Sequence, residues 1–123
     1  MRGFGLKSVA TAVVVVLGLW LAPVASAKLP PSGKYGCTHD GSFFGNLRVD
    51  GKRYKKDRSK WGKMVDRGGH KIRFKSGIFK GEFRGYWEKV DSVLQPGKKI
   101  VEIELETIED NFTRTYCTLE KRA

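Results

Sequence analysis

The chain has 123 residues, of which 30% are charged, and its 24 basic and 13 acidic residues give a formal net charge of +11 at pH 7. A chain of this length forms one domain. Its two cysteines and two histidines are too few and too widely spaced for an ordinary zinc site, so we predict no metal and no cofactor.

The first 27 residues show the three parts of a secretory signal peptide. Arg2 and Lys7 form a short positive segment, residues 9–22 form an uncharged apolar run, and residues 25–27 supply small side chains for cleavage. A membrane-spanning helix needs about 20 apolar residues, so this shorter run favours a cleaved signal over a membrane anchor. We therefore expect a chain of residues 28–123, periplasmic or secreted, with no membrane span.

The exported chain would keep 22 basic and 13 acidic residues, a formal net charge of +9. This charge is unevenly distributed, because residues 28–89 hold 17 basic and 6 acidic residues, whereas residues 90–123 hold 5 and 7. Such asymmetry predicts one positive side, which attracts polyanions. The alternative is that a high positive charge only keeps a small exported protein soluble.

Cys37 and Cys117 lie near the two ends of the predicted single β domain, residues 34–123, which follows an exposed lead-in of residues 28–33. Export implies an oxidising compartment, where one even pair of cysteines forms a disulfide. Closing a loop of this length contributes about 4 kcal/mol in the chain-entropy account. A metal or redox pair is the alternative, and the wide separation of the cysteines disfavours it.

Apolar and polar residues alternate with a period of two, and turn signals recur about every 8 to 12 residues. No apolar period of a helix is present in residues 28–123. This pattern predicts an all-β fold, a small antiparallel β-barrel or barrel-like sandwich of seven to eight strands with one disulfide. The expected strands are residues 34–38, 44–50, 53–56, 61–65, 70–75, 78–90, 100–107 and 112–119.

Alternation also assigns inward and outward faces, because successive side chains of a strand point to opposite sides. The segment 72–87 mixes cations with aromatics, yet its aromatics fall on the apolar face. Platforms for stacked bases must be exposed, so we expect core aromatics, with glycines that suit a sharply bent strand. The expected inward residues are Ile72, Phe74, Phe79, Gly81, Phe83, Gly85 and Trp87. The outward residues of segment 70–75 include the cations Lys71, Arg73 and Lys75, and those of segment 100–107 are Glu102, Glu104 and Glu106. If these two strands are neighbours, the cations and the glutamates form ion pairs across them.

Segment 52–63, KRYKKDRSKWGK, concentrates seven basic residues and one acid around two aromatics. Dense positive charge on a loop beside aromatics is typical of a surface that binds polyanions. The partner would be an acidic polysaccharide, a lipopolysaccharide, another anionic envelope component such as teichoic acid, or extracellular nucleic acid. The alternative is a solvated loop whose Tyr54 and Trp61 turn into the core. The predicted anion-binding residues are Lys52, Arg53, Lys55, Lys56, Arg58, Lys60, Trp61 and Lys63.

We therefore predict a non-enzymatic exported binding or envelope protein with a basic surface for an anionic partner. An alternative is a lipocalin-like or inhibitor-like barrel that acts on a small apolar ligand or on a protein. A third is a nuclease-like enzyme in which His39 and His70 act as acid and base. No nucleophile motif or phosphate-binding glycine loop accompanies these histidines, so we predict no catalytic residue.

Three short motifs resemble those of a largely uncharacterised group of small exported bacterial β proteins with one disulfide. The motifs are Gly33-Lys34-Tyr35-Gly36-Cys37 (G-x-Y-x-C), Phe74-Lys75-Ser76-Gly77 (F-x-S-G) and the late Tyr116-Cys117. They span most of residues 28–123 and are structural in character. The resemblance therefore implies a shared fold and little about activity.

A looser resemblance is to periplasmic inhibitors of C-type lysozyme, small β-barrels that also open with Tyr-x-Cys and close with a late disulfide partner. Those inhibitors carry an S-G-x-x-Y loop that enters the lysozyme cleft. Here the loop is Ser76-Gly77-Ile78-Phe79-Lys80, with the aromatic one position early and a lysine in place of the tyrosine. A chain at +9 also repels a basic partner. The resemblance therefore implies a barrel shape and not the inhibitor's function.

Overall fold

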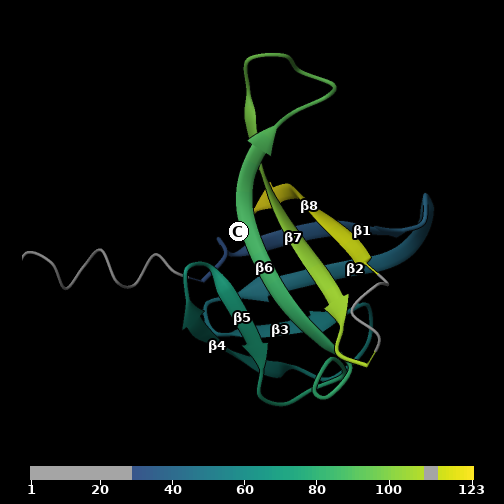
Figure 1. The fold of residues 1–123 in the computed structure, drawn as a ribbon, viewed down its shortest axis with the longest axis vertical. Coiled ribbons are helices and arrows are strands. Elements are labelled where there is room, and N and C mark those ends of the chain that lie inside the picture. Colours follow the sequence, from purple (N-terminus) through teal and green to yellow (C-terminus); the bar gives the residue numbers. More distant parts are fainter. Residues whose placement is uncertain (1–28, 110–113) are drawn as a thin grey trace, which may run out of the picture.

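In the computed structural model, which describes residues 29–109 and 114–123, the alternating residues form eight antiparallel strands (Figure 1). Each strand pairs with its neighbours in sequence, and β1 also pairs with β8, so the sheet closes into a barrel. The predicted all-β barrel with one disulfide is confirmed. The strands are β1 (Gly33–His39), β2 (Ser42–Asp50), β3 (Arg53–Lys56), β4 (Gly62–Gly68), β5 (Lys71–Phe74), β6 (Phe83–Asp91), β7 (Lys99–Thr107) and β8 (Arg114–Arg122).

The connections alternate between the two ends of the barrel, because consecutive strands run antiparallel. One end, which we name the arm end, holds connections 51–52, 69–70 and 92–98, the start of β1 and the end of β8. The opposite end holds connections 40–41, 57–61 and 75–82. All eight strands lie within residues 33–122, so a chain that begins at Lys28 contains the whole barrel.

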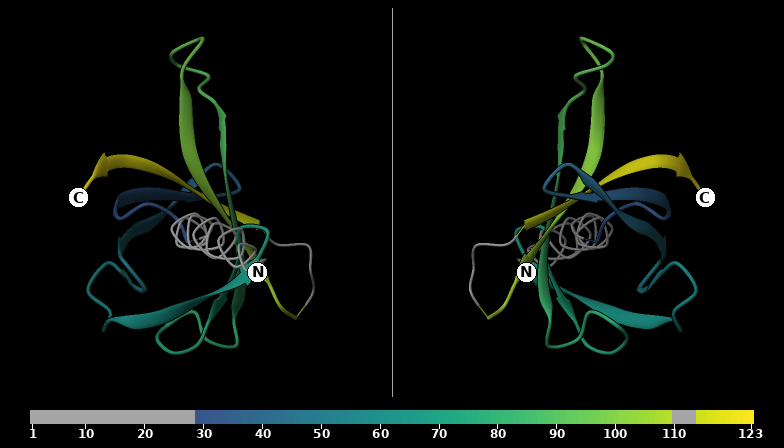
Figure 2. Two further views of the ribbon diagram at one scale, coloured as in Figure 1. Left: turned by 90° about the vertical axis from the view of Figure 1, so that its left-hand side faces the viewer. Right: turned by 90° about the vertical axis from the view of Figure 1, so that its right-hand side faces the viewer.

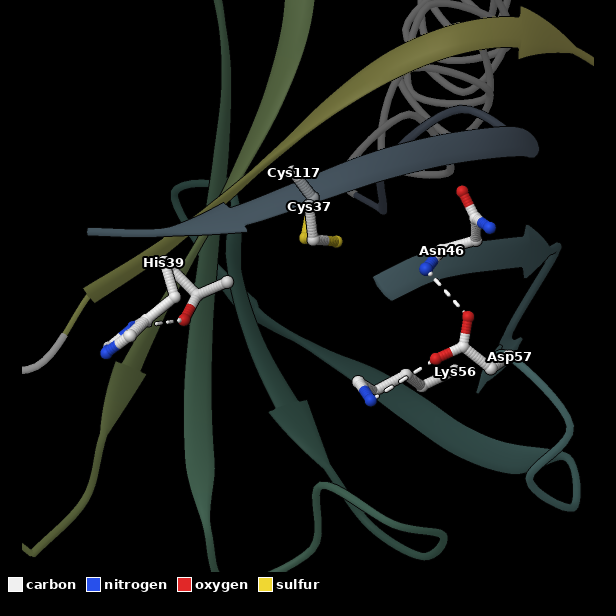
Figure 3. Close-up of a disulfide and its surroundings, with 7 residues drawn as sticks. Cys37, His39, Asn46, Lys56, Asp57 and Cys117 are labelled. Atoms are coloured by element: carbon white, nitrogen blue, oxygen red, sulfur yellow. Dashed lines mark hydrogen bonds and ion pairs between the residues drawn. A yellow bond between two sulfur atoms is a disulfide. The ribbon is translucent and has the colours of Figure 1, made fainter. Parts of the chain in front are cut away.

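Cys37 on β1 and Cys117 on β8 lie directly opposite each other and form a disulfide inside the barrel (Figure 3). The bond crosses the seam at which the first strand meets the last, and it joins residues separated by 80 positions in the sequence. An unpaired edge strand exposes its backbone hydrogen-bonding groups. The covalent bond therefore holds both terminal strands in the closed sheet.

The barrel interior is filled by apolar side chains, with an aromatic cluster towards the opposite end. Tyr54 stacks on Phe79 with 5.2 Å between ring centroids, and Phe74 packs edge-on against both rings. Burial raises the pKa of the Tyr54 hydroxyl. The buried apolar residues are Tyr35, Cys37, Leu47, Val49, Tyr54, Met64, Ile72, Phe74, Phe79, Trp87, Val101, Ile103, Leu105 and Cys117.

The connection between β5 and β6 is fixed to the barrel by hydrogen bonds to its Ser-Gly pair. The Tyr54 hydroxyl donates to the Ser76 carbonyl oxygen at 2.8 Å, and the Lys63 backbone N–H donates to Ser76 Oγ at 3.0 Å. Gly77 has a φ of 93°, and a Cβ at this position would lie 2.7 Å from the Gly62 Cα. The Ser-Gly pair of the F-x-S-G motif therefore holds this connection against β3 and β4.

The β6–β7 hairpin projects beyond the barrel as an arm (Figures 1 and 2). The ladder between β5 and β6 ends at Tyr86, and the ladder between β7 and β8 begins at Glu102. Residues 89–101 consequently have strand pairing only within the hairpin. Figure 2 shows the last part of β8 diverging from the arm, which leaves one edge of β7 uncovered there.

The predicted strand 78–90 begins too early. β6 starts at Phe83, because residues 77–83 form a turn in which the Phe79 carbonyl accepts hydrogen bonds from the Glu82 and Phe83 N–H groups. Phe79 reaches the core from this turn. Gly81 lies exposed in the same turn and not on an inward strand face. Gly85, in contrast, is buried against Ile72, as predicted.

The outward cations Lys71, Arg73 and Lys75 were expected to pair with the glutamates of β7 only if the two strands were neighbours. They are not neighbours, because β6 lies between β5 and β7. Two of the three glutamates, Glu104 and Glu106, pair instead with arginines of the neighbouring strands. Arg84 Nε on β6 lies 3.2 Å from Glu106 Oε1, and Arg114 on β8 bridges Glu104 at 3.4 Å and Glu106 at 3.3 Å.

The predicted strand 53–56 coincides with β3, and the remaining strand bounds lie within three residues of those predicted. β4 begins at Gly62 instead of residue 61, and β8 continues to Arg122. The predicted start of the last strand at residue 112 and the predicted signal peptide lie outside the described residues. Within the described part of the chain there is no helix long and apolar enough to cross a membrane.

Candidate anion-binding surface

The seven cations predicted from segment 52–63 do not form one patch. Lys52 lies in the connection 51–52 at the arm end, whereas Arg58 and Lys60 lie in the connection 57–61 at the opposite end. Three others point outward from the barrel wall, two on β3 and one on β4: Arg53, Lys55 and Lys63. The segment therefore contributes only part of its charge to any single surface.

Lys56 points to the inner side of the barrel wall, since it follows the outward Lys55 and lies opposite the buried Leu47. Its Nζ lies 3.3 Å from Asp57 Oδ2 (Figure 3). The same ammonium lies 4.6 Å from the centre of the Phe44 ring. The Asn46 backbone N–H donates to Asp57 Oδ1 at 2.9 Å, and this hydrogen bond lowers the pKa of the carboxyl group. Lys56 is thus half-buried and neutralised locally.

Trp61 lies on the outer surface and is 37% exposed. The Arg53 guanidinium lies 4.4 Å and the Lys55 ammonium 5.0 Å from the centre of its ring. The interpretation that both aromatics turn into the core is thus right for Tyr54 and wrong for Trp61. An exposed indole with two cations beside it offers a surface for a sugar ring or a base that carries anionic groups.

A row of four directly opposed cations crosses four adjacent strands and leads to Trp61. Lys121 on β8 lies opposite Lys34 on β1, and Lys34 lies opposite Arg48 on β2. Arg48 in turn lies opposite Lys55 on β3, whose ammonium contacts the Trp61 ring. We name these four residues the cation row.

The members of the cation row share one outer surface, because directly opposite residues of paired strands point to the same side. Lys34, Arg48 and Lys121 are exposed and Lys55 is half-buried. Neighbouring strands lie about 4.8 Å apart, so the row is about 15 Å long. A hollow of about 230 Å³, lined by Lys34, Asn46, Leu47, Arg48 and Asp57, lies alongside it.

Charge is arranged differently on the two sides of the barrel. Across β6, β7 and β8 the arginines and glutamates form ion pairs. In the cation row each cation faces another cation, an arrangement that destabilises a sheet. Among residues 29–109 and 114–123, none of the four forms an ion pair with a carboxylate. The row therefore has unneutralised charge with which to bind an extended anion.

The sequence-based prediction missed Lys34, Arg48 and Lys121. Each is a single cation between other residues of its strand, and they come together only through the register of three strand pairs. Alternation with buried neighbours such as Tyr35 and Leu47 indicates that Lys34 and Arg48 point outward. Nothing local in the sequence indicates that they lie side by side.

The two histidines lie at opposite ends of the barrel. His39 is the last residue of β1, at the end of the barrel away from the arm. Its Nδ1 is 3.1 Å from Thr115 Oγ1 and its Nε2 is 3.4 Å from Asp40 Oδ2. His70 lies in the connection 69–70 at the arm end and stacks on Trp87 with 4.0 Å between ring centroids. These two side chains therefore cannot act on one substrate atom, which requires hydrogen-bond range. The described residues include no group of three side chains suited to hold a metal ion.

A comparison with known protein families, with curated proteins and with solved structures finds no match to this chain. The two family resemblances noted in the sequence accordingly stay predictions.

Proposed function

We propose that this protein is an exported, non-enzymatic binding protein whose cation row takes an extended anionic polymer. The observation that carries the proposal is the succession of three like-charged pairs, Lys121 with Lys34, Lys34 with Arg48 and Arg48 with Lys55. Like charges placed directly opposite each other cost stability. A bound polyanion would relieve that repulsion while gaining favourable contacts with each cation.

The dimensions of the cation row fit a linear chain with an anionic group about every 5 Å, the spacing of neighbouring strands. Trp61 at the end of the row would stack on a sugar ring or a base of the same polymer. Acidic polysaccharides, the phosphorylated core of lipopolysaccharide and single-stranded nucleic acid all share this chemistry.

The alternative functions have less support. An internal site for an apolar ligand needs free space, but aromatic and aliphatic side chains fill the interior around Tyr54, Phe74 and Phe79. An inhibitor loop needs a free Ser-Gly segment, but the carbonyl and hydroxyl oxygens of Ser76 both accept hydrogen bonds from the barrel.

The first experiment is a fluorescence titration of the chain from Lys28, with its disulfide intact, against three polyanions. Heparin, lipopolysaccharide and single-stranded DNA are each titrated at low and at near-physiological salt. We expect saturable binding to one of them at near-physiological salt, with a fluorescence change that is lost in a Trp61→Phe variant. If the partner is single-stranded DNA, four phosphate contacts predict a slope of log K against log salt of about −3.

A matched pair of variants separates the cation row from net charge. Arg48→Glu reverses the charge in the middle of the row. Arg73→Glu makes the same change on β5, where Arg73 also faces another arginine, Arg84. We expect Arg48→Glu to weaken binding at least about tenfold, or about 1.4 kcal/mol, and Arg73→Glu to have only a small effect. Equal losses in both variants, or no saturable binding at near-physiological salt, would contradict the proposal.

A further inference from the structure

The arm ends in two exposed aliphatic residues. Val93 and Leu94 are 93% and 92% exposed, more than any other large apolar side chains among the described residues. They lie in the connection 92–98, at the far tip of the hairpin (Figures 1 and 2). Exposed apolar residues at the outermost point of a molecule have no partner within the fold, and clusters of this kind mark interaction sites.

The arm carries a net positive charge. Residues 89–99 contain three lysines and a single acid, Asp91, which pairs with Lys99 at 2.7 Å. The Lys98 backbone N–H donates to the Gln95 carbonyl, which places Lys98 beside the tip. The arm therefore presents a small apolar point with cations directly behind it.

A cationic pocket lies at the base of the arm, where β7 and β8 diverge. Its volume is about 290 Å³, and three apolar residues of the two strands, Ile100, Val101 and Leu119, form part of its lining. The rest of the lining consists of four cations and one acid: Lys89, Lys99, Lys121, Arg122 and Glu120. This combination suits a phosphate group attached to an apolar body.

We propose that the arm end docks on the surface of an anionic phospholipid bilayer. Val93 and Leu94 insert among the headgroups, and the lysines behind them contact lipid phosphates. The cationic pocket holds one phosphodiester headgroup, with the start of an acyl chain against Leu119. Each basic residue near an anionic membrane surface adds about 1 kcal/mol of attraction, and shallow insertion of aliphatic side chains adds to it.

A bilayer suits this end better than a protein partner does. A specific protein interface buries about 800 Å² on each partner, and two aliphatic side chains on a narrow tip offer far less apolar surface. A partner strand added to the uncovered edge of β7 would leave the tip residues unused. A bilayer accommodates a narrow apolar point and uses the surrounding charge as well.

The test measures flotation of the chain from Lys28 with vesicles of phosphatidylglycerol and phosphatidylcholine in equal parts, and with vesicles of phosphatidylcholine alone. We expect binding to the anionic vesicles only. The double variant Val93→Ser, Leu94→Ser should bind at least about tenfold more weakly, since it removes the inserted aliphatic groups. Because both side chains are exposed, the fold should be unaffected, which thermal unfolding would verify.

Phe43→Ser is the matched control, because Phe43 is 70% exposed at the opposite end. This variant should bind vesicles like the unaltered chain. In a Leu94→Trp variant, the added indole should shift its emission to the blue on binding and be quenched by lipids brominated on the acyl chain.

Several outcomes would overturn the membrane proposal: absence of binding to anionic vesicles, unchanged binding of the Val93–Leu94 double variant, or loss of binding in Phe43→Ser. The proposal does not rest on polymer binding by the cation row. The double variant should keep its affinity for the polyanion, whereas Arg48→Glu should lose it. Failure of the membrane proposal can therefore be distinguished from failure of the polyanion proposal.

Discussion

Lys34 on β1 lies directly opposite Arg48 on β2, at the centre of a row in which every neighbour is also a cation. Net charge alone does not require this arrangement, because the same barrel pairs its arginines with glutamates across β6, β7 and β8. Functional surfaces often retain such unfavourable arrangements at some cost in stability. The conflict between stability and binding in this row gives the first prediction.

Arg48→Glu should stabilise the folded protein while it weakens polyanion binding. The new carboxylate would face Lys34 and Lys55, so two repulsive pairs become attractive, and we expect the free energy of unfolding to rise by about 1 kcal/mol at low salt. Urea unfolding measures this change. The gain should shrink in high salt, where exposed charges are screened. A variant that is less stable than the unaltered chain at low salt would contradict the assigned register.

Removal of the Cys37–Cys117 disulfide should cost about 4 kcal/mol, because the bond closes a loop of 80 residues in the unfolded chain. Small domains are stable by about 5 to 10 kcal/mol, so the loss would be a large part of the total. The measurement compares urea midpoints of the chain from Lys28 with and without a reductant. A Cys37→Ala, Cys117→Ala variant serves as control, since its midpoint should match the reduced chain and not respond to the reductant.

Tyr54→Phe should destabilise the barrel by about 2 to 3 kcal/mol. The substitution removes a hydroxyl that donates to the Ser76 carbonyl and accepts from the Phe79 N–H, and it leaves that buried N–H without its acceptor. Tyr35→Phe is the comparison, because among the described residues the Tyr35 hydroxyl makes only a donated bond, to the Pro31 carbonyl at 2.6 Å. We expect a loss of about 1 kcal/mol there. Equal losses by urea unfolding would show that the accepted bond contributes nothing.

Stability should fall in alkaline solution because of the same two tyrosines. Burial raises the pKa values of Tyr35 and Tyr54 above the ordinary value of 10.0. The folded state then holds its protons more tightly than the unfolded state, so the stabilisation is complete below pH 10 and decreases as the pH rises above it. Urea unfolding between about pH 9 and about pH 11 should show a smaller decrease in Tyr35→Phe than in the unaltered chain. An identical decrease in the two proteins would argue against ionisation of Tyr35 as a cause. Lysine deprotonation affects both proteins alike and cancels in the comparison.

The sequence was sufficient to predict the fold class and the disulfide. Alternation of apolar and polar residues is a local property, so it located all eight strands. The cysteines near both ends of the domain could form a bond across a closed barrel only if the first and last strands meet, which they do. The start of β6 was misplaced because the spacing of Phe79 and Phe83 in the turn imitates the period of a strand.

The candidate site was only partly predictable. Local charge density pointed to segment 52–63, yet only Lys55 of that segment belongs to the cation row. Trp61 lies at the end of the row, beside Lys55. The inward position of Lys56 was available from alternation, since it follows the buried Tyr54 by two residues. Lys34, Arg48 and Lys121 come together through strand register, and register depends on pairings between distant parts of the chain that no local pattern specifies.

The Ala123 backbone N–H donates to the Ser32 carbonyl oxygen at 3.1 Å, so the described chain ends beside the start of β1. A short glycine–serine linker could join these two points, with new termini opened at the exposed Gly69 between β4 and β5. Such a circular permutant would keep the strand order around the barrel, the cation row and the arm. The Cys37–Cys117 bond would then close a short loop around the linker instead of most of the domain. Reduction should consequently cost the permutant much less stability than it costs the original chain.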